Sequence, residues 1–348
     1  MKYSITRVNN PAAMQAFMQV PRLVYGAGRV PPTAESMNLM RYTPLTNPVM
    51  RHIHLTSFVA LEEGRPVGRI TASIDHLNPR PEEGFWGGFE CLERPEIAKG
   101  LLNAAAEWLQ GQGKTVMIGP ATLNTNQQVG FLIKGFEYEP QHEIPYNPPY
   151  YRELVEQAGL EKLHELECFE WHLPDELPAL LSAVKPVSGL VIRSVNYRAV
   201  YREAKIIMDV HNRAMAEVWG FIPMTLEDAA GFLSSQSMTI PPDLFLIFEL
   251  EGQVAGTFLS IPTRAPGPDG KGGLIRLAIG GVVPEVRHRG IARHVLKEFY
   301  TRCRKLGYTK GEASQIAESN DMVKRKIIKP ILGGKVIKLY RVYQQKLA

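Results

Sequence analysis

The feature that most constrains the fold is an internal repeat. Residues 58–73 and 246–260 each read as an apolar strand, a Glu-Gly turn and a second strand with a glycine four residues after the turn. The turn glycines Gly64 and Gly252, and the strand glycines Gly68 and Gly256, are separated by the same 188 residues. Self-similarity at a fixed spacing indicates two copies of one structural unit.

A second match lies downstream of each hairpin. Residues 96–113 and 290–307 both have the periodicity of an amphipathic helix and both end in glycine, at a spacing of 194 residues. The six extra residues fit into the turn-rich segment 265–273. A hairpin followed by a helix is also a common order, so coincidence is the alternative. We expect two diverged α/β copies at residues 1–173 and 190–348, joined by a proline-bearing linker at 174–189.

The charge is distributed unevenly along the chain. The net charge is +5, but residues 271–348 contain 18 Lys and Arg against 5 Asp and Glu, while residues 1–270 contain 22 against 30. A basic C-terminal segment attracts polyanions, which include nucleic acid, an anionic membrane surface and a phosphorylated cofactor. Nucleic acid is the least favoured of these, because the basic residues have no aromatic stacking platform among them.

Compartment and metal content were assessed from the cysteines and the apolar runs. No apolar run approaches the roughly 18 residues of a membrane span, and the N-terminal residues lack the apolar core of a signal peptide. Three cysteines lie far apart, without the spacing of metal ligands. We therefore expect a cytoplasmic protein with reduced thiols, no transmembrane segment and no metal.

One basic turn stands out in the second copy. Residues 274–283 are nearly all apolar, as in a central strand, and a helix follows Gly290. A helix N-terminus carries unpaired N–H groups and partial positive charge, and a glycine lets an anion approach the backbone closely. The alternative is a solvated basic helix cap. The residues expected to form the anion site are Val282, Val283, Arg287, His288, Arg289, Gly290, Ile291 and Ala292.

The order of elements around this turn resembles the GNAT superfamily of acyl-CoA N-acyltransferases. The apolar strand, Arg287-x-x-Gly290-x-Ala292, a helix, a strand, Asn320 and a helix ending in Leu-Gly-Gly-Lys carry the resemblance. It implies two tandem GNAT-like domains of the α/β (α+β) class, each a mixed, mostly antiparallel sheet with flanking helices. It also implies that the turn binds the diphosphate of acyl-CoA, that the pantetheine lies between two splayed strands, and that Asn320 contacts the cofactor. Asn320 equally fits a helix N-cap.

The whole chain also looks like bacterial tandem proteins of this superfamily, through the segments GFWGGFE, NPPYY and YRVY. In the first copy, however, Glu96 occupies the position that matches Gly290, and Pro95 removes one N–H donor. We expect the first copy not to bind CoA and to shape the acceptor pocket instead, or to be merely structural. The candidate acceptor-binding residues, which equally could satisfy their own turns, are Asn124, Asn126, Tyr146 and Asn147.

Acyl transfer to an amine needs a base for the amine proton and, in the resembling family, often a tyrosine that protonates the thiolate. Glu312 and Glu318 bracket a predicted strand and are the candidate bases, although pairing with nearby Lys and Arg is the alternative. The tyrosine expected about seven residues after Asn320 is replaced by Ile327. Tyr340 on the last strand, or Tyr343, is the candidate acid.

The predicted function is direct transfer of an acyl group from acetyl-CoA or a longer acyl-CoA to an amine on a small molecule or a lipid. The alternatives are a long-chain N-acyltransferase acting on a lipid amine and a non-catalytic acyl-CoA-binding or sensor protein. The sequence does not identify the acceptor, the acyl length or the oligomeric state.

Overall fold

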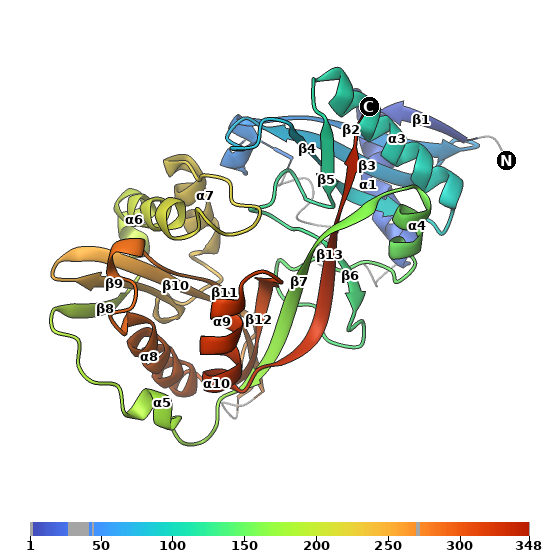
Figure 1. Ribbon diagram of the computed structural model, residues 1–348. Coiled ribbons are helices and arrows are strands. Elements are labelled where there is room, and N and C mark those ends of the chain that lie inside the picture. The colour runs from blue at the N-terminus through green and yellow to red at the C-terminus, as the bar shows by residue number, and fades with distance from the viewer. Residues whose placement is uncertain (1–2, 27–41, 44, 269–271, 348) are drawn as a thin grey trace. The chain divides into compact units, whose positions relative to one another are not determined.

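The computed structural model describes residues 3–26, 42–43, 45–268 and 272–347 (Figure 1). Its internal contacts divide the chain into two compact units. Unit 1 comprises Met1–Glu165 and Lys338–Ala348, and unit 2 comprises Leu166–Ile337. Two strands, β7 (Glu161–His172) and β13 (Lys335–Lys346), therefore begin in one unit and end in the other.

Unit 1 is built on a mixed sheet with the strand order β1-β2-β3-β4-β5-β13, and β6 also pairs with β13. Strands β4 and β5 are parallel, and the other pairings described in this unit are antiparallel. Its elements are β1 (Tyr3–Arg7), α1 (Pro11–Tyr25), η1 (Pro48–Arg51), β2 (Ile53–Glu62), β3 (Arg65–Asp75), β4 (Glu83–Cys91), α3 (Pro95–Gly111), β5 (Val116–Gly119), β6 (Phe131–Lys134) and α4 (Tyr151–Gln157), with parts of β7 and β13.

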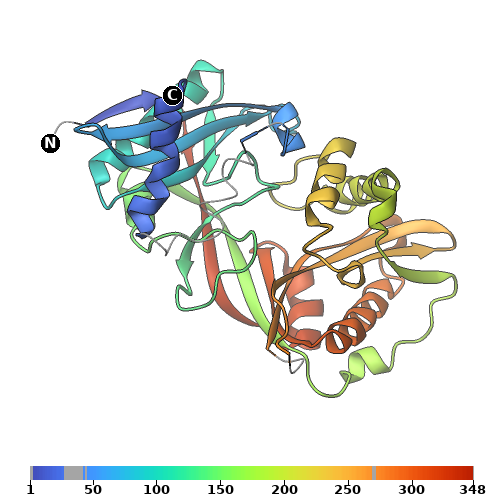
Figure 2. The same cartoon turned by 180° about the vertical axis from the view of Figure 1, so that it is seen from behind.

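The two faces of the unit 1 sheet are covered by different helices, and Figure 2 shows α1 across one of them. Neighbouring residues of a strand point to opposite faces. Val59 packs with Phe17 and Val20 of α1, whereas Ala60 packs in a separate cluster with α3 side chains such as Leu101. Both faces of β2 and β3 are therefore buried, which explains why these strands read as apolar runs in the sequence.

Unit 2 has the strand order β7-β12-β11-β10-β9-β8, in which only β11 and β12 are parallel among the pairings described. Figure 1 shows α6 and α7 on one side of β8–β11 and α8 on the other. The elements are α5 (Ala179–Ser182), β8 (Leu190–Ser194), η2 (Tyr197–Ala199), α6 (Val200–Ala214), α7 (Leu226–Gln236), η3 (Pro242–Leu244), β9 (Phe245–Leu250), β10 (Gln253–Arg264), β11 (Gly273–Val282), η4 (Pro284–Val286), α8 (Ile291–Lys305), β12 (Tyr308–Ala317), α9 (Asp321–Val323), the π-helical turn η5 (Lys324–Ile328) and α10 (Lys329–Leu332).

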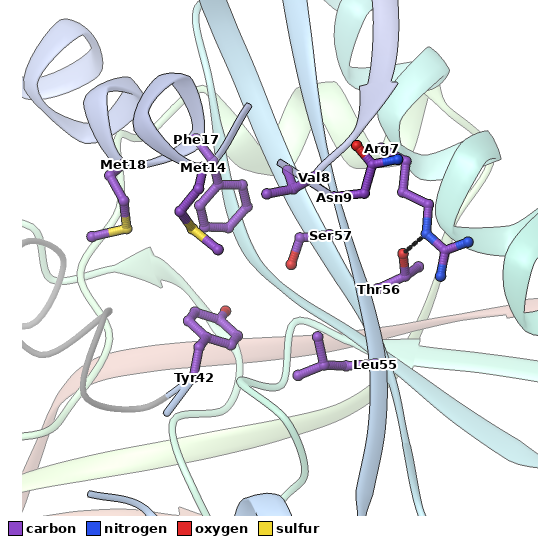
Figure 3. A pocket seen from close by; sticks show the side chains of 10 residues that line it. All are labelled: Arg7, Val8, Asn9, Met14, Phe17, Met18, Tyr42, Leu55, Thr56 and Ser57. Atoms are coloured by element: carbon purple, nitrogen blue, oxygen red, sulfur yellow. Dashed lines mark hydrogen bonds between the residues drawn. The ribbon is translucent and has the colours of Figure 1, made fainter. Parts of the chain in front are cut away.

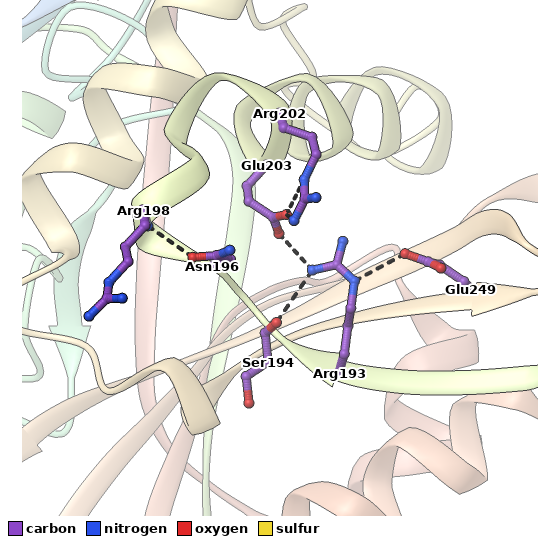
Figure 4. Close-up of polar contacts among 7 residues, drawn as sticks. All are labelled: Arg193, Ser194, Asn196, Arg198, Arg202, Glu203 and Glu249. Atoms are coloured by element: carbon purple, nitrogen blue, oxygen red, sulfur yellow. Dashed lines mark hydrogen bonds and ion pairs between the residues drawn. The ribbon is translucent and has the colours of Figure 1, made fainter.

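An ion-pair cluster ties α6 to strand β8 (Figure 4). Glu203 on α6 is fully buried, and its carboxylate oxygens accept from Arg193 at 2.8 Å and from Arg202 at 2.9 Å. Arg193 also bonds Glu249 on β9 at 3.1 Å. A buried carboxylate is stable only with such partners, so this cluster fixes the start of α6 on the sheet.

The pairing registers confirm the two tandem copies. In unit 1, Gly68 lies between Ala60 and Cys91 on the adjacent strands, and in unit 2, Gly256 lies between Phe248 and Val282. The predicted fold class, two copies of a mixed and mostly antiparallel sheet with flanking helices, is therefore correct.

The two Glu-Gly turns adopt the same backbone conformation. Glu63 and Gly64 have φ of 48° and 80°, and Glu251 and Gly252 have φ of 53° and 76°. Positive φ at both central residues is typical of a two-residue hairpin, which explains the glycine at the second position of each turn.

The last strand of each copy pairs with the other copy's sheet. Strand β13 pairs with β5, from Tyr343↔Gly119 to Lys346↔Val116. Strand β7 pairs with β12, from Lys310↔His172 to Ala317↔Leu166. The sequence predicted the last strand of the second copy, now β13, but neither β7 nor the partner of either strand. The predicted boundaries at residues 173 and 190 stay a prediction.

Among the described residues, none of the helices combines the length and the apolar character that a membrane crossing requires.

Replacing Gly256 by alanine tests the close approach of strands β10 and β11. The new Cβ would overlap the carbonyl oxygen of Gly281 and the Phe248 ring, so we expect the free energy of unfolding to fall by about 1–3 kcal/mol. Calorimetry measures the change. Gly111→Ala is the control, because nothing lies within 4 Å of its new Cβ. Equal stability of Gly256→Ala and the wild type would contradict the close approach of β10 and β11.

Candidate functional site

Two parallel strands of unit 2 separate part of the way along their length. Strands β11 and β12 pair from Gly273↔Tyr308 to Leu277↔Ala313 and no further in the described residues. Beyond that point β11 stays paired with β10 as far as Val282, and β12 stays paired with β7 as far as Ala317. The strands diverge because each one follows its outer neighbour, which leaves one backbone edge of residues 278–282 without a strand beside it.

Side chains close the point of separation and leave the rest of β11 open. The Arg276 guanidinium donates from Nε and Nη2 to the Ser314 carbonyl at 3.3 Å, just past the last paired residue of β12. Further along β11, Ile279 is 40% exposed and Gly280 is also exposed. The open edge therefore runs from a charged, hydrogen-bonded apex toward the solvent.

Helix α8 begins at the outer end of β11, after a turn that leaves its first N–H groups available. Gly290 is the N-cap, with φ of 81°, in the left-handed region that favours glycine. No atom lies within 4 Å of the position where its Cβ would stand. Among the described residues, none accepts a hydrogen bond from the backbone N–H of Gly290, Ile291 or Ala292. Such a helix start can bind an anion.

The basic side chains of this turn have different environments. Arg287 turns back toward the sheet, where Nε donates to the Val282 carbonyl at 3.1 Å and Nη2 to the Ala214 carbonyl at 3.0 Å. It therefore holds the turn against the end of α6. His288 and Arg289 are exposed. Arg289 adds positive charge next to the helix start, and the His288 ring offers a further hydrogen-bonding group there.

The remaining residues of the predicted anion site contribute mostly through the backbone. Val283 is 1% exposed, and its N–H donates to the Ala255 carbonyl at 2.9 Å. Val282 is paired with Gly256, and Ile291 is buried in the core. Asn320 is the N-cap of α9, and its Oδ1 accepts from the Val323 N–H at 3.3 Å. Its contact with a cofactor stays a prediction.

One of the two candidate bases lies on β12 and the other follows it. Glu312 is 2% exposed and opposite Arg276, one residue before the pairing with β11 ends. Glu318 follows the strand and is half-buried, and its carbonyl accepts from Lys324 Nζ at 2.7 Å. Unit 2 thus brings Glu312, rather than Glu318, next to the point where the strands separate.

The equivalent helix start in unit 1 is closed. Helix α3 begins at Pro95, which matches Arg289, so it starts two residues earlier than α8 and has no left-handed residue before it. The Glu96 carboxylate lies in the first turn, and Arg94 donates to it at 2.6 Å. The backbone N–H of Glu96 and the Arg94 charge lower the pKa of this carboxyl, which keeps it ionised. A second anion would be repelled there.

Tyr340 and the predicted acceptor residues all belong to unit 1. The Tyr340 side chain is buried, and its hydroxyl donates to the Pro145 carbonyl at 3.1 Å. Asn147 is used for structure, because its Oδ1 accepts from the Leu132 N–H at 2.7 Å. Tyr340 thus belongs to unit 1, whereas the candidate bases Glu312 and Glu318 belong to unit 2. A role for Tyr340 as the acid stays a prediction.

The two predicted asparagines of the loop after β5 stabilise that loop. Asn124 Nδ2 donates to Asp75 Oδ2 at 2.7 Å, and Asn124 Oδ1 accepts from the Asn126 N–H at 3.0 Å. Asp75 also accepts from Leu77 N–H at 2.8 Å and contacts His52 Nδ1 at 2.8 Å. This arrangement agrees with the alternative that these polar residues satisfy their own turns.

Two cavities lie in unit 1. The first, of about 240 Å³, is bounded by α1 side chains such as Met14 and Phe17 and by β2 (Figure 3). Two of its hydroxyls are bonded, since Arg7 donates to Thr56 Oγ1 at 2.8 Å and Ser57 Oγ lies 2.8 Å from Thr71 Oγ1. The Tyr42 hydroxyl, which also belongs to the lining, is buried without a partner among the described residues. The second, of about 60 Å³, lies where β4 leaves β5 and is lined by two of the predicted acceptor residues, Tyr146 and Asn147, among others.

Sequence reasoning missed Arg69 and Glu90, which line the second cavity. Their signal was a charged residue within an otherwise apolar strand, on β3 and on β4. Within the described residues, no group of three or more His, Cys, Asp or Glu side chains is placed to hold a metal ion.

Comparisons with known proteins were made at the level of sequence and structure. No family model matches the chain. It is 28% identical, over an alignment of 378 residues, to a bacterial ceramide synthase from Caulobacter vibrioides, covering 99% of this chain and 97% of that protein. It is 30% identical over 262 residues to protein YghO from Escherichia coli, covering 73% of this chain and 66% of that protein.

Solved structures share the architecture at low sequence identity. A tandem GNAT protein from the clavulanic acid biosynthesis pathway aligns with a TM-score of 0.62 and 15% identity, covering 100% of this chain and 99% of that one. A probable N-acyltransferase from Enterococcus faecalis aligns with a TM-score of 0.60 and 13% identity, covering 100% of this chain and 73% of that one. The fold is therefore that of a tandem-domain protein of the GNAT superfamily. The relative that aligns over nearly the whole chain is a ceramide synthase, and the chain shares its fold with tandem GNAT proteins.

The two arginines of the turn should respond differently to substitution. Arg287→Met leaves the Val282 and Ala214 carbonyls without their charged donor, so we expect the free energy of unfolding to fall by about 1–3 kcal/mol. Arg289→Met removes only an exposed charge and should change stability by less than about 0.5 kcal/mol. Thermal unfolding of both variants measures this. A loss for Arg287→Met no larger than that for Arg289→Met would show that Arg287 does not hold the turn.

Proposed function

We propose that the chain transfers a fatty acyl group from acyl-CoA to the amine of a lipid, by direct attack of the amine on the thioester. The observation that carries the proposal is the combination of a β11 edge without a strand beside it and an open helix start at its outer end. An extended ligand with a diphosphate at one end and a thioester at the other matches both features.

The residues present fit this donor. The N–H groups at Gly290, Ile291 and Ala292 offer donors to the diphosphate, Arg289 adds charge around it, and His288 can add a hydrogen bond. The backbone edge of residues 278–282 can hydrogen-bond the peptide-like arm of the ligand, as an added strand would. The ligand supplies an activated acyl carbonyl. The chain must supply a base for the amine proton and donors for the developing oxyanion.

We assign the base to Glu312. An arm that enters at Gly290 and follows the open edge of β11 ends where the strands meet, which is where Glu312 lies. When the amine nitrogen bonds to the carbonyl carbon, the C–S bond breaks, the base accepts the amine proton and the sulfur leaves as thiolate. Glu318 lies five residues beyond the last pair, toward the helix end of the site.

A lipid amine is the acceptor class that the relatives support. The relative that aligns over nearly the whole chain is a bacterial ceramide synthase. A ceramide is a long-chain amino-alcohol whose amine carries a fatty acyl group. The exposed Ile279 on the open edge of β11 is compatible with an apolar acyl chain near the thioester.

Gly290→Glu tests the donor site. The new carboxylate would face the helix start, so we expect CoA affinity to fall by at least a hundredfold in titration calorimetry. The new carboxylate repels the diphosphate and accepts from the N–H groups that would otherwise bind it. The Glu96 carboxylate in unit 1 accepts from its own backbone N–H in the same way.

Gly333→Glu is the matched control. Gly333 also has a left-handed backbone, with φ of 62°, and nothing within 4 Å of its Cβ position, but it follows the end of α10. Both variants add the same charge and the same backbone strain. CoA affinity that falls equally in both, or in neither, would refute the assignment of the turn.

Glu312→Gln tests the catalytic assignment. Removal of a general base should lower kcat by about 10²–10⁴-fold while CoA still binds. Free thiol release is measured with palmitoyl-CoA and acetyl-CoA over sphinganine, a short alkyl amine and an amino acid. Glu318→Gln should retain most of the rate. The reverse order would move the base to Glu318, and CoA binding without thiol release from any acceptor would indicate a binding protein instead.

A further inference from the structure

Two opposite charges lie side by side in the interior of unit 1 without forming an ion pair. Arg69 on β3 and Glu90 on β4 are directly opposite in the antiparallel register and are 1% and 6% exposed. Side chains at such positions share one face and normally interact. None of the ion pairs found in the described part of the chain joins them. Burial raises the pKa of the Glu90 carboxyl, and the charge of Arg69 opposes this shift only in part.

Each of the two groups is held by other partners. Glu90 accepts from the Tyr151 hydroxyl at 2.6 Å and from the Tyr25 hydroxyl at 3.4 Å. Arg69 donates from Nη1 to the Phe17 carbonyl at 3.3 Å, and its guanidinium lies 4.7 Å from the centre of the Phe17 ring. Arg69 Nε is buried and has no acceptor in the described part of the chain.

The second cavity, of about 60 Å³, is lined by both charges. Gln128 also lines it, and Gln128 Nε2 is a second buried donor without an acceptor among the described residues. A buried donor left unpaired is destabilising, so two of them at one cavity require an explanation. The cavity has room for roughly four to six atoms of the size of a water oxygen.

We propose that this cavity binds the hydroxyl groups of a small polyol or amino-alcohol head. A hydroxyl oxygen accepts from Arg69 Nε and Gln128 Nε2, and the hydroxyl proton is donated to Glu90. A carboxylate would lie against the Glu90 carboxyl, and an ammonium without a hydroxyl would lie against Arg69 and leave both N–H donors unpaired. A hydroxyl is neutral, donates and accepts, and therefore satisfies all three groups.

This site is separate from the turn at Gly290 and is defined without reference to CoA. Its residues belong to unit 1, whereas the turn belongs to unit 2. Binding is therefore measured in the absence of CoA, and a failure here leaves the proposed acyl transfer untouched.

The test follows the Nε–H signal of Arg69 by NMR in the full chain while three probes are added. The probes are serinol, glycerol and n-propylamine. Serinol has an amine and two hydroxyls, glycerol has hydroxyls only, and n-propylamine has an amine only. We expect saturable shifts with serinol and glycerol and none with n-propylamine. Arg69→Lys identifies the signal by its absence. If that variant does not fold, contacts to the Phe17 ring identify it instead.

The neighbouring glutamines provide a matched pair of variants. Gln128→Leu removes one donor, and we expect serinol to bind at least about fivefold more weakly, the effect of one hydrogen bond. Gln127→Leu makes the same change at a residue outside the lining of the cavity and should bind serinol as the wild type does. The proposal is overturned by an unmoved Arg69 signal, by shifts with n-propylamine alone, or by equal affinity of the two variants.

Discussion

The structure of the candidate site depends on the point where β11 and β12 stop pairing. Parallel strands are usually joined along their shared length, but here each strand is hydrogen bonded to a second neighbour that continues in a different direction. Arg276 covers the Ser314 carbonyl at the point of separation. The unpaired edge and the helix start at Gly290 lie at the two ends of one turn, and a thioester donor with a diphosphate needs both parts.

The two copies preserve different parts of this design. In unit 1, β4 and β5 also pair over a short length, from Glu83↔Val116 to Phe85↔Ile118, and a cavity lies beyond that point. The helix start of unit 1, however, is filled by its own carboxylate, Glu96. A divided role follows from this difference: the copy with the open helix start can bind an anion, and the copy with buried Arg69 and Glu90 can bind a neutral polar group.

Each sheet contains a strand from the other half of the sequence. Because β13 completes unit 1 and β7 extends into unit 2, neither half of the sequence contains all the strands of one unit. Tyr340, which the sequence places at the end of the second copy, consequently has its hydroxyl bonded in unit 1. Cutting the chain at the linker would remove a strand from each sheet, so each unit is completed only by residues from the other half of the sequence.

The sequence by itself determined the repeat, the class of fold and the position of the basic turn. Those features depend on local physics: the glycines at the two hairpin turns have positive φ, and the N-cap Gly290 requires the left-handed region. Only the tertiary structure decided which strand lies beside β5 or β12, that Arg287 turns inward to the Ala214 carbonyl, and that Arg69 and Glu90 face one cavity. These features depend on contacts between residues far apart in the chain, and a strand's apolar pattern specifies that it is buried without specifying its neighbour.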